Sequence, residues 1–187
     1  MNHELRSAFL RTLPFLLVIC VTIILVIRRK IKPEELDLIP PLKHLRALLW
    51  VFGFILFSVL VEAVLYAFEL LEVRSWNHSG AASVILIAGA ILFAPIAEEL
   101  LFRGFILNVL KKRGLKNQLA IVLQAIFFVL LHNFTYENTL TSTIGIFQGF
   151  VDAVLYACAR QNTRSLYTPM AMHMSGNAIA ILEKFIF

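Results

Sequence analysis

The chain has 187 residues, of which 59% are hydrophobic and only 16% are charged. Soluble domains average about 45–50% apolar and about 25% charged residues, so this composition excludes an ordinary soluble domain and predicts a membrane protein. A net charge of +5 would suggest nucleic acid in a soluble protein, but here the basic residues lie beside apolar runs and favour anionic lipid. The only two cysteines, Cys20 and Cys158, fall within apolar runs and indicate neither a disulfide framework nor a zinc motif.

Six apolar runs are close to the length of about 17–25 residues that a membrane-spanning helix needs. In chain order they are Leu13–Ile27, Ala47–Phe68, Ala81–Leu110, Leu119 to about His132, Leu140–Ala159 and Leu166–Phe187. The basic stretch Arg28–Lys30 follows the first run in place of a small-residue cleavage site, which favours a retained anchor helix over a signal peptide. Pro95, in the middle of the third run, predicts a tilted or kinked helix. The predicted fold class is all-α, a polytopic transmembrane helix bundle of about six spans.

Basic residues alternate between successive loops of this arrangement. Residues 28–46 carry six Lys or Arg, residues 111–117 carry four and residues 160–164 carry two, whereas residues 69–80 and 133–139 together hold only Arg74. The positive-inside rule therefore places the three basic loops in the cytoplasm and both termini outside. The charged, proline-bearing stretch "KIKPEELDLIPPLK" is the one clear linker. It divides an N-terminal anchor helix and cytoplasmic linker, residues 1–45, from a functional bundle, residues 46–187.

Three ionisable residues stand in the apolar stretch "APIAEELLFRGF" of the third run, namely Glu98, Glu99 and Arg103. Ionisable groups at membrane depth are costly, and they are functional hypotheses by default. Glu99 and Arg103 are four residues apart, so their side chains share a helix face and can pair. Glu98 is turned about 100° from Glu99 and is the carboxylate less engaged by the arginine. Alone, this pair could equally be a helix-packing bridge.

Two further helices bring polar groups to a similar depth. His132 ends "FVLLH" in the fourth run, and His173 and Asn177 share one face of the sixth run. Because neighbouring helices run in opposite directions, Glu98, His132, His173 and Asn177 come to overlapping depths. Singly, His132 could be a histidine at a helix end, and His173 with Asn177 could be interhelical hydrogen-bond glue.

Two more acids, Glu62 and Asp152, also lie within predicted spans, and no role follows from their positions. They could serve as helix–helix contacts, and they show that not every buried acid needs to be catalytic.

These motifs resemble those of a known family. "EELLFR" (Glu98–Arg103) is similar to the EExxxR motif of the CAAX prenyl endopeptidase and bacteriocin-processing family, also called CPBP or Abi. "FVLLH" and "HMSGN" resemble its FxxxH and HxxxN/D motifs, in the same order. The resemblance covers residues 81–187. It departs at Ala153, where a second glycine is usual in the family's Gly-bearing helix, and at Arg164, where a turn glycine is common.

The resemblance implies an intramembrane glutamic endopeptidase. Glu98 would act as general base and His132 would orient the attacking water, while His173 and Asn177 would donate to the oxyanion. Glu99 and Arg103 would support the helix face that presents Glu98. No cofactor is expected. The alternative is a zinc enzyme with Glu98, His132 and His173 as ligands.

The expected partners are membrane lipid and a peptide or membrane-protein substrate, in a bacterial plasma membrane, with no nucleic acid. A function of a different class also remains open, a non-proteolytic membrane partner or bacteriocin-immunity protein that uses the same pocket for binding. A small transporter is a third reading, although no inverted repeat supports it.

Overall fold

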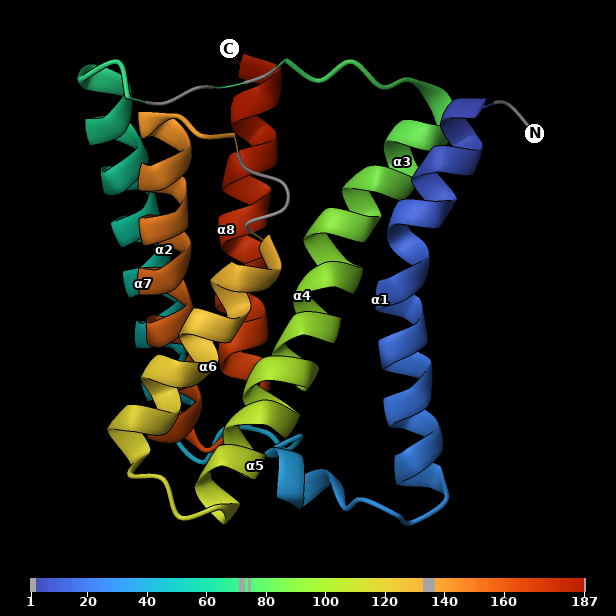
Figure 1. The fold of residues 1–187 in the computed structure, drawn as a ribbon, viewed down its shortest axis with the longest axis vertical. Helices are drawn as coiled ribbons and strands as arrows, with labels where there is room; N and C mark the ends of the chain where they lie inside the picture. The colour runs from blue at the N-terminus through green and yellow to red at the C-terminus, as the bar shows by residue number, and fades with distance from the viewer. Residues whose placement is uncertain (1–2, 71–72, 74, 133–136, 187) are drawn as a thin grey trace.

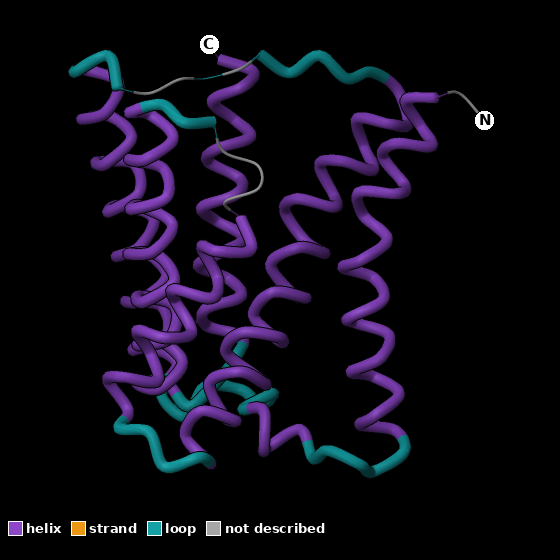
Figure 2. Tube along the Cα trace, in the orientation of Figure 1, coloured by secondary structure: helices purple, strands orange, loops and turns teal. Residues whose placement is uncertain are grey.

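The computed structural model describes residues 3–70, 73, 75–132 and 137–186. Within these residues the chain is helical and contains no strand, which confirms the all-α prediction (Figures 1 and 2). The elements are α1 (His3–Ile27), a 3₁₀ turn (Pro33–Leu36), α2 (His44–Ala67), α3 (Gly80–Ala88), α4 (Ala94–Glu98), α5 (Leu107–Lys112), α6 (Asn117–His132), α7 (Leu140–Thr163) and α8 (Tyr167–Ile186). Two π-helical segments, Gly89–Phe93 and Glu99–Ile106, join α3, α4 and α5 into one rod.

The described helices correspond to the six predicted runs, but α1 begins at His3, ten residues before the predicted start at Leu13. The end of the last run, at Phe187, lies outside the described residues. Four of the described segments are long and apolar enough to cross a membrane, at residues 3–27, 44–67, 80–112 and 140–163. α6 is apolar but has only 16 residues, about 24 Å of helix against a hydrocarbon core of about 30 Å. α8 has 20 residues and carries several polar side chains, so it is not among the four. The chain is a multi-pass transmembrane helix bundle, and the two helices outside these four, the short α6 and the more polar α8, carry candidate site residues.

The rod from Gly80 to Lys112 is the helix that carries Glu98. Pro95 lacks a backbone N–H, and the helix accommodates it with a wider turn in which Ala94 N–H bonds to the carbonyl of Gly89, five residues back. The second π-helical segment begins at Glu99, directly after Glu98. Such π-helical insertions occur frequently at functional sites, and here they flank the candidate base on both sides.

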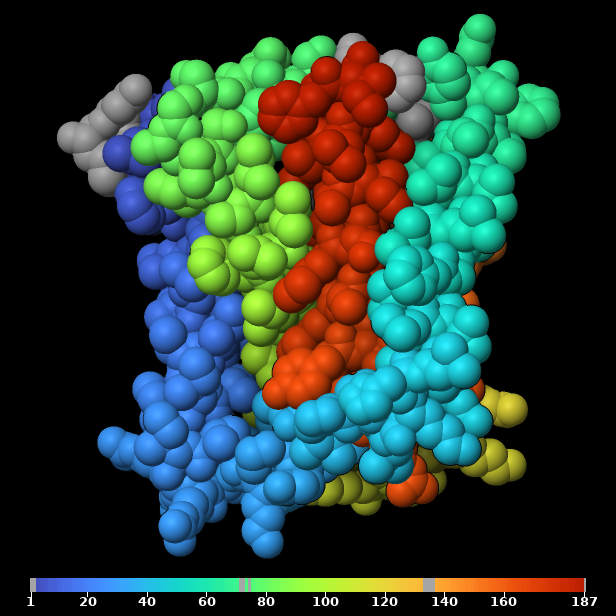
Figure 3. Space-filling view, turned by 180° about the vertical axis from the view of Figure 1, so that it is seen from behind, coloured from blue at the N-terminus to red at the C-terminus, as the bar shows by residue number. Residues whose placement is uncertain are grey.

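Both termini lie at one end of the bundle, and the predicted basic loops gather at the other end (Figure 1). α8 runs between α2 and the rod on the face shown in Figure 3, and α1 stands at one side of the rod. This arrangement matches an even number of passages through the membrane. Which end faces the cytoplasm stays a prediction from the loop charges.

The predicted linker is docked on the bundle. Leu36 is buried, Leu166 N–H donates to the carbonyl of Asp37 at 2.7 Å, and the Asp37 carboxylate pairs with Arg160 at 2.8 Å. The placement of Arg160 in a loop after Ala159 was therefore wrong. Helix α7 continues to Thr163 because Arg160 finds partners inside the bundle, including the carbonyl of Arg103. The division into residues 1–45 and 46–187 stays a prediction.

The two residues that depart from the family pattern have defined surroundings in the fold. Ala153 has a small, completely buried side chain, and its carbonyl accepts hydrogen bonds from Arg103 at 3.0 Å and Gln124 at 3.1 Å. Arg164 ends α7 with a φ of +50°, the left-handed conformation that glycine adopts most readily.

Close packing of α1 on the rod depends on Gly89. A Cβ at Gly89 would lie 2.7 Å from Oγ1 of Thr12, a buried residue whose hydroxyl donates to the carbonyl of Ala8. We expect Gly89→Ala to lower the free energy of unfolding by about 1–3 kcal/mol, because the overpacked contact pushes α1 away. Thermal or denaturant unfolding in one detergent measures this loss.

Gly53 provides the matched control in α2, since a Cβ there meets no heavy atom within 4 Å. Alanine favours a helix more than glycine does, so Gly53→Ala should leave stability unchanged or raise it slightly. Equal effects of the two substitutions would show that α1 is not held by this contact.

Candidate active site

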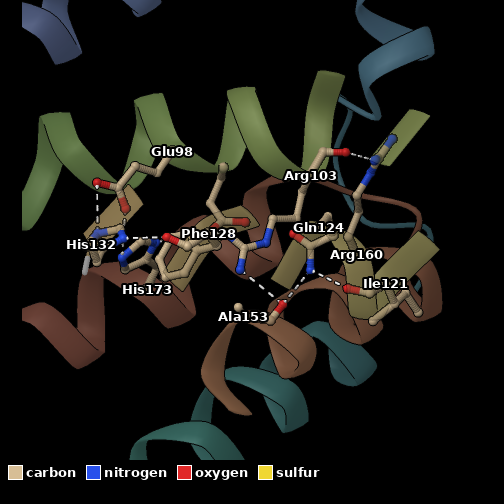
Figure 4. Close-up of polar contacts among 10 residues, drawn as sticks. Glu98, Arg103, Ile121, Gln124, Phe128, His132, Ala153, Arg160 and His173 are labelled. Atoms are coloured by element: carbon tan, nitrogen blue, oxygen red, sulfur yellow. Dashed lines mark hydrogen bonds and ion pairs between the residues drawn. The ribbon is translucent and has the colours of Figure 1, made fainter. Parts of the chain in front are cut away.

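A single apolar face of α6 leads to His132. Its buried residues are Ala120, Ile121, Gln124, Ala125 and Phe128, a spacing that puts one stripe against the bundle. His132 lies one turn beyond Phe128, and its Nδ1 contacts the carbonyl of Phe128 at 2.8 Å. The ring of Phe128 packs on that of His132 with centroids 4.5 Å apart. The imidazole is thus held at the end of the helix with Nε2 directed toward Glu98 (Figure 4).

Glu98 meets both histidines. One carboxylate oxygen lies 3.8 Å from Nε2 of His132, and the other lies 3.6 Å from Nε2 of His173 (Figure 4). These separations are longer than a direct hydrogen bond and are of the kind that a water molecule can bridge. Three helical segments far apart in sequence therefore bring these three predicted residues together.

Glu99 binds both Arg103 and His173. Its Oε1 accepts from Nη1 of Arg103 at 2.9 Å, as the i,i+4 spacing predicts, and it also lies 3.0 Å from Nδ1 of His173. Glu99 and Arg103 are fully buried, and the guanidinium lies over the ring of Phe128 at 4.7 Å. Glu98 and Glu99 reach opposite edges of one imidazole, so adjacent acids on the rod both position His173.

The hydrogen bonds of the two Nδ1 atoms determine whether each Nε2 atom is a donor or an acceptor. The carbonyl of Phe128 can only accept, and so can the ionised carboxylate of Glu99, so each Nδ1 must donate. In a neutral imidazole the Nε2 atom is then an acceptor, and both face the carboxylate of Glu98. With both rings neutral, three acceptor groups face one another here, and a water molecule between them can donate to two of them.

Asn177 lies one turn beyond His173 on α8, but it does not contact Glu98 directly. Its Nδ2 donates to the carbonyl of Ala90 at 2.7 Å, in the first π-helical segment of the rod. The carboxamide carries a second N–H, which this bond leaves for another acceptor. Asn177, His132 and His173 line one cavity of about 190 Å³.

Glu98, His132 and His173 are also the residues of the zinc alternative. Among the residues that the structure describes, no three His, Cys, Asp or Glu side chains are arranged to hold a metal ion. Zinc needs ligand atoms at about 2.0–2.2 Å in a tetrahedral arrangement. The choice between a metal-free site and a zinc site stays a prediction.

Sequence reasoning missed two polar residues that support the site. Gln124 is fully buried and donates to the carbonyls of Ile121 and Ala153, each at 3.1 Å. Arg160 donates to the carbonyl of Arg103 and so binds the rod to α7 (Figure 4). Gln124 could have been found, because it stands two turns before His132 on the same face of an otherwise apolar helix. No comparable signal marked Arg160, which is followed by the polar residues of a helix end.

Comparison with known proteins identifies the family of this chain. The family model described as type II CAAX prenyl endopeptidase Rce1-like matches residues 79–179, more than half of the 187 residues. An uncharacterized 24.3 kDa protein of Escherichia coli is 30% identical over 92 residues, which cover 49% of this chain and 40% of that relative. No solved structure matches the chain at a significant level. The matched region contains Glu98, His132, His173 and Asn177 in their helices. The chain therefore belongs to the Rce1-like family of type II CAAX prenyl endopeptidases, a family of membrane proteases.

Proposed function

We propose that this chain is an intramembrane endopeptidase that hydrolyses a peptide bond with water activated by Glu98. The observation that carries the proposal is the approach of both Nε2 atoms to the two oxygens of the Glu98 carboxylate, at 3.8 and 3.6 Å. A water between these groups would donate one hydrogen to Glu98 and the other to Nε2 of His132. Its lone pair would then be left for the scissile carbonyl.

His173 and Asn177 would stabilise the oxyanion that forms on that carbonyl. Asn177 supplies the N–H that is not used by Ala90. His173 already uses Nδ1 toward Glu99, so it donates from Nε2 only when the ring carries both protons. Glu98 would take a proton from water and pass it to the leaving amine as the tetrahedral intermediate collapses, which returns the carboxylate to its starting state.

The family membership and the apolar helices support a peptide or membrane-protein substrate reached from the lipid. The basic loops at one end of the bundle suit an anionic leaflet, and the relative in Escherichia coli supports a bacterial plasma membrane.

Comparative membrane proteomics of cells with the wild-type chain and with Glu98→Ala tests the proposal. We expect at least one membrane polypeptide to accumulate uncut in the variant, at equal levels of the two proteins. Identical fragment patterns with an unchanged cellular phenotype would instead support a non-proteolytic binding partner.

Removal of metal separates the glutamate mechanism from the zinc alternative. We expect the purified protein to keep its rate of cleavage after treatment with a chelator in metal-free buffer, because the base is Glu98 itself. A complete loss that added zinc restores would assign Glu98, His132 and His173 as metal ligands.

A further inference from the structure

The cavity beside the candidate catalytic residues extends past them to a second set of polar groups. Besides His132, His173 and Asn177, it is lined by Glu62 of α2 and by Asp152 and Tyr156 of α7. α2 and α7 both pack against α8, and Figure 3 shows α2 beside α8 on the face it draws. Glu62 does take part in a helix–helix contact, because Gln148 of α7 donates to it. Glu62 and Asp152 also share one hollow with His132, His173 and Asn177.

The carboxylate oxygens of Glu62 and Asp152 are only partly hydrogen-bonded within the described residues. Gln148 donates to Oε1 of Glu62 at 2.8 Å, but Oε2 of Glu62 and Oδ1 of Asp152 are buried without a hydrogen-bond partner among the described residues. Neither acid forms an ion pair within that part of the chain. Buried acids without a partner cost several kcal/mol, and in membrane proteins they mark sites where a substrate or ion is met.

Tyr156 is a buried polar residue in the lining of the same hollow. Its side chain is only 3% exposed, and its ring stacks on that of His173 with centroids 4.9 Å apart and an interplanar angle of 20°. Tyr156 lines the same cavity, and none of the hydrogen bonds between described residues involves its hydroxyl. Two carboxylates and this hydroxyl can all accept hydrogen bonds from one occupant.

We propose that this hollow is a substrate subsite for a cationic side chain, lysine or arginine, close to the bond that is cut. That the bound group belongs to a substrate rests on the proposed function. That the hollow binds a cationic group does not. An ammonium or guanidinium group carries several donors and no acceptor, which suits the unpaired carboxylate oxygens of Glu62 and Asp152, with the Tyr156 side chain in the same lining. An apolar side chain would leave both acids unpaired in a low-dielectric site.

Binding to a protein that cannot turn over tests the subsite directly. The probe is a series of labelled apolar peptides with one lysine placed at each position in turn, and matched peptides with norleucine in place of lysine. In Glu98→Gln protein held in nanodiscs, the best lysine peptide should bind at least about tenfold more tightly than its norleucine match. The preference should disappear when Glu62→Gln and Asp152→Asn are added, and should persist with the exposed control Glu34→Gln.

Tyr156→Phe gives a second variant, because it removes only the hydroxyl and keeps the ring on His173. It should reduce the lysine preference about threefold or more. The absence of a lysine preference at every position would overturn the subsite, as would a preference that survives loss of both acids.

The wild-type protein is then assayed for cleavage of the same peptides. Glu98-dependent cutting without a preference for basic residues would keep the proposed function and reject the subsite. A lysine preference in binding without any cutting would keep the cation site and reject the protease.

Discussion

Purified Glu98→Gln protein is expected to cleave substrate about 100- to 10,000-fold more slowly than wild type, the range that a positioned general base contributes. Glutamine keeps the size of the side chain and one acceptor oxygen, but it cannot take a proton from water. Because the Glu98 side chain is 14% exposed and forms no contact shorter than 3.6 Å with either histidine, folding should be unchanged. Rates of cleavage in proteoliposomes and the unfolding temperature measure the two effects.

Glu183→Gln is the matched control for that experiment. It removes another acid from a bundle helix, and Glu183 does not line the cavity beside the active site. Its rate should stay within about threefold of wild type. If Glu98→Gln also stayed within that range, Glu98 would not be the base.

Arg103→Met should produce the largest loss of stability, about 3–5 kcal/mol. Methionine fills much of the same space, but it leaves the fully buried carboxylate of Glu99 without its arginine. It also removes the bond from Nη2 to the carbonyl of Ala153, which binds the rod to α7. The free energy of unfolding in detergent is the measurement.

A double-mutant cycle distinguishes loss of the ion pair from loss of packing. Adding Glu99→Gln to Arg103→Met removes the uncompensated charge and should restore part of the stability. Cleavage should not recover, because glutamine no longer holds Nδ1 of His173 as the carboxylate does. Additive losses of stability in the double variant would contradict the role given to this pair.

Much of the site could be predicted because its residues stand out against an apolar background. Glu99 and Arg103 pair as their i,i+4 spacing predicts, and the helices that carry Glu98, His132 and His173 run as the hydropathy pattern indicates. The contacts between distant segments could not be predicted. Arg160 is buried because its partners, Asp37 and the carbonyl of Arg103, are supplied by parts of the chain far from it in sequence. Similarly, Asn177 meets Ala90 only once α8 packs on the rod.

The π-helical segments were also beyond sequence reasoning. Proline predicts an interruption near residue 95, but not that the wider turns would fall on each side of Glu98. The positions of these wider turns depend on packing around the rod, including the close approach of Thr12 to Gly89. Local patterns thus predicted which polar side chains lie together in the bundle, and tertiary contacts decided which atoms of each face one another.

An experimental structure of the protein in lipid nanodiscs, with anomalous data at the zinc edge, tests the central claim most directly. We expect one water-sized density peak between the carboxylate of Glu98 and the Nε2 atoms of His132 and His173, without anomalous signal. A zinc peak at that point, or a Glu98 side chain turned toward lipid and away from both histidines, would contradict it.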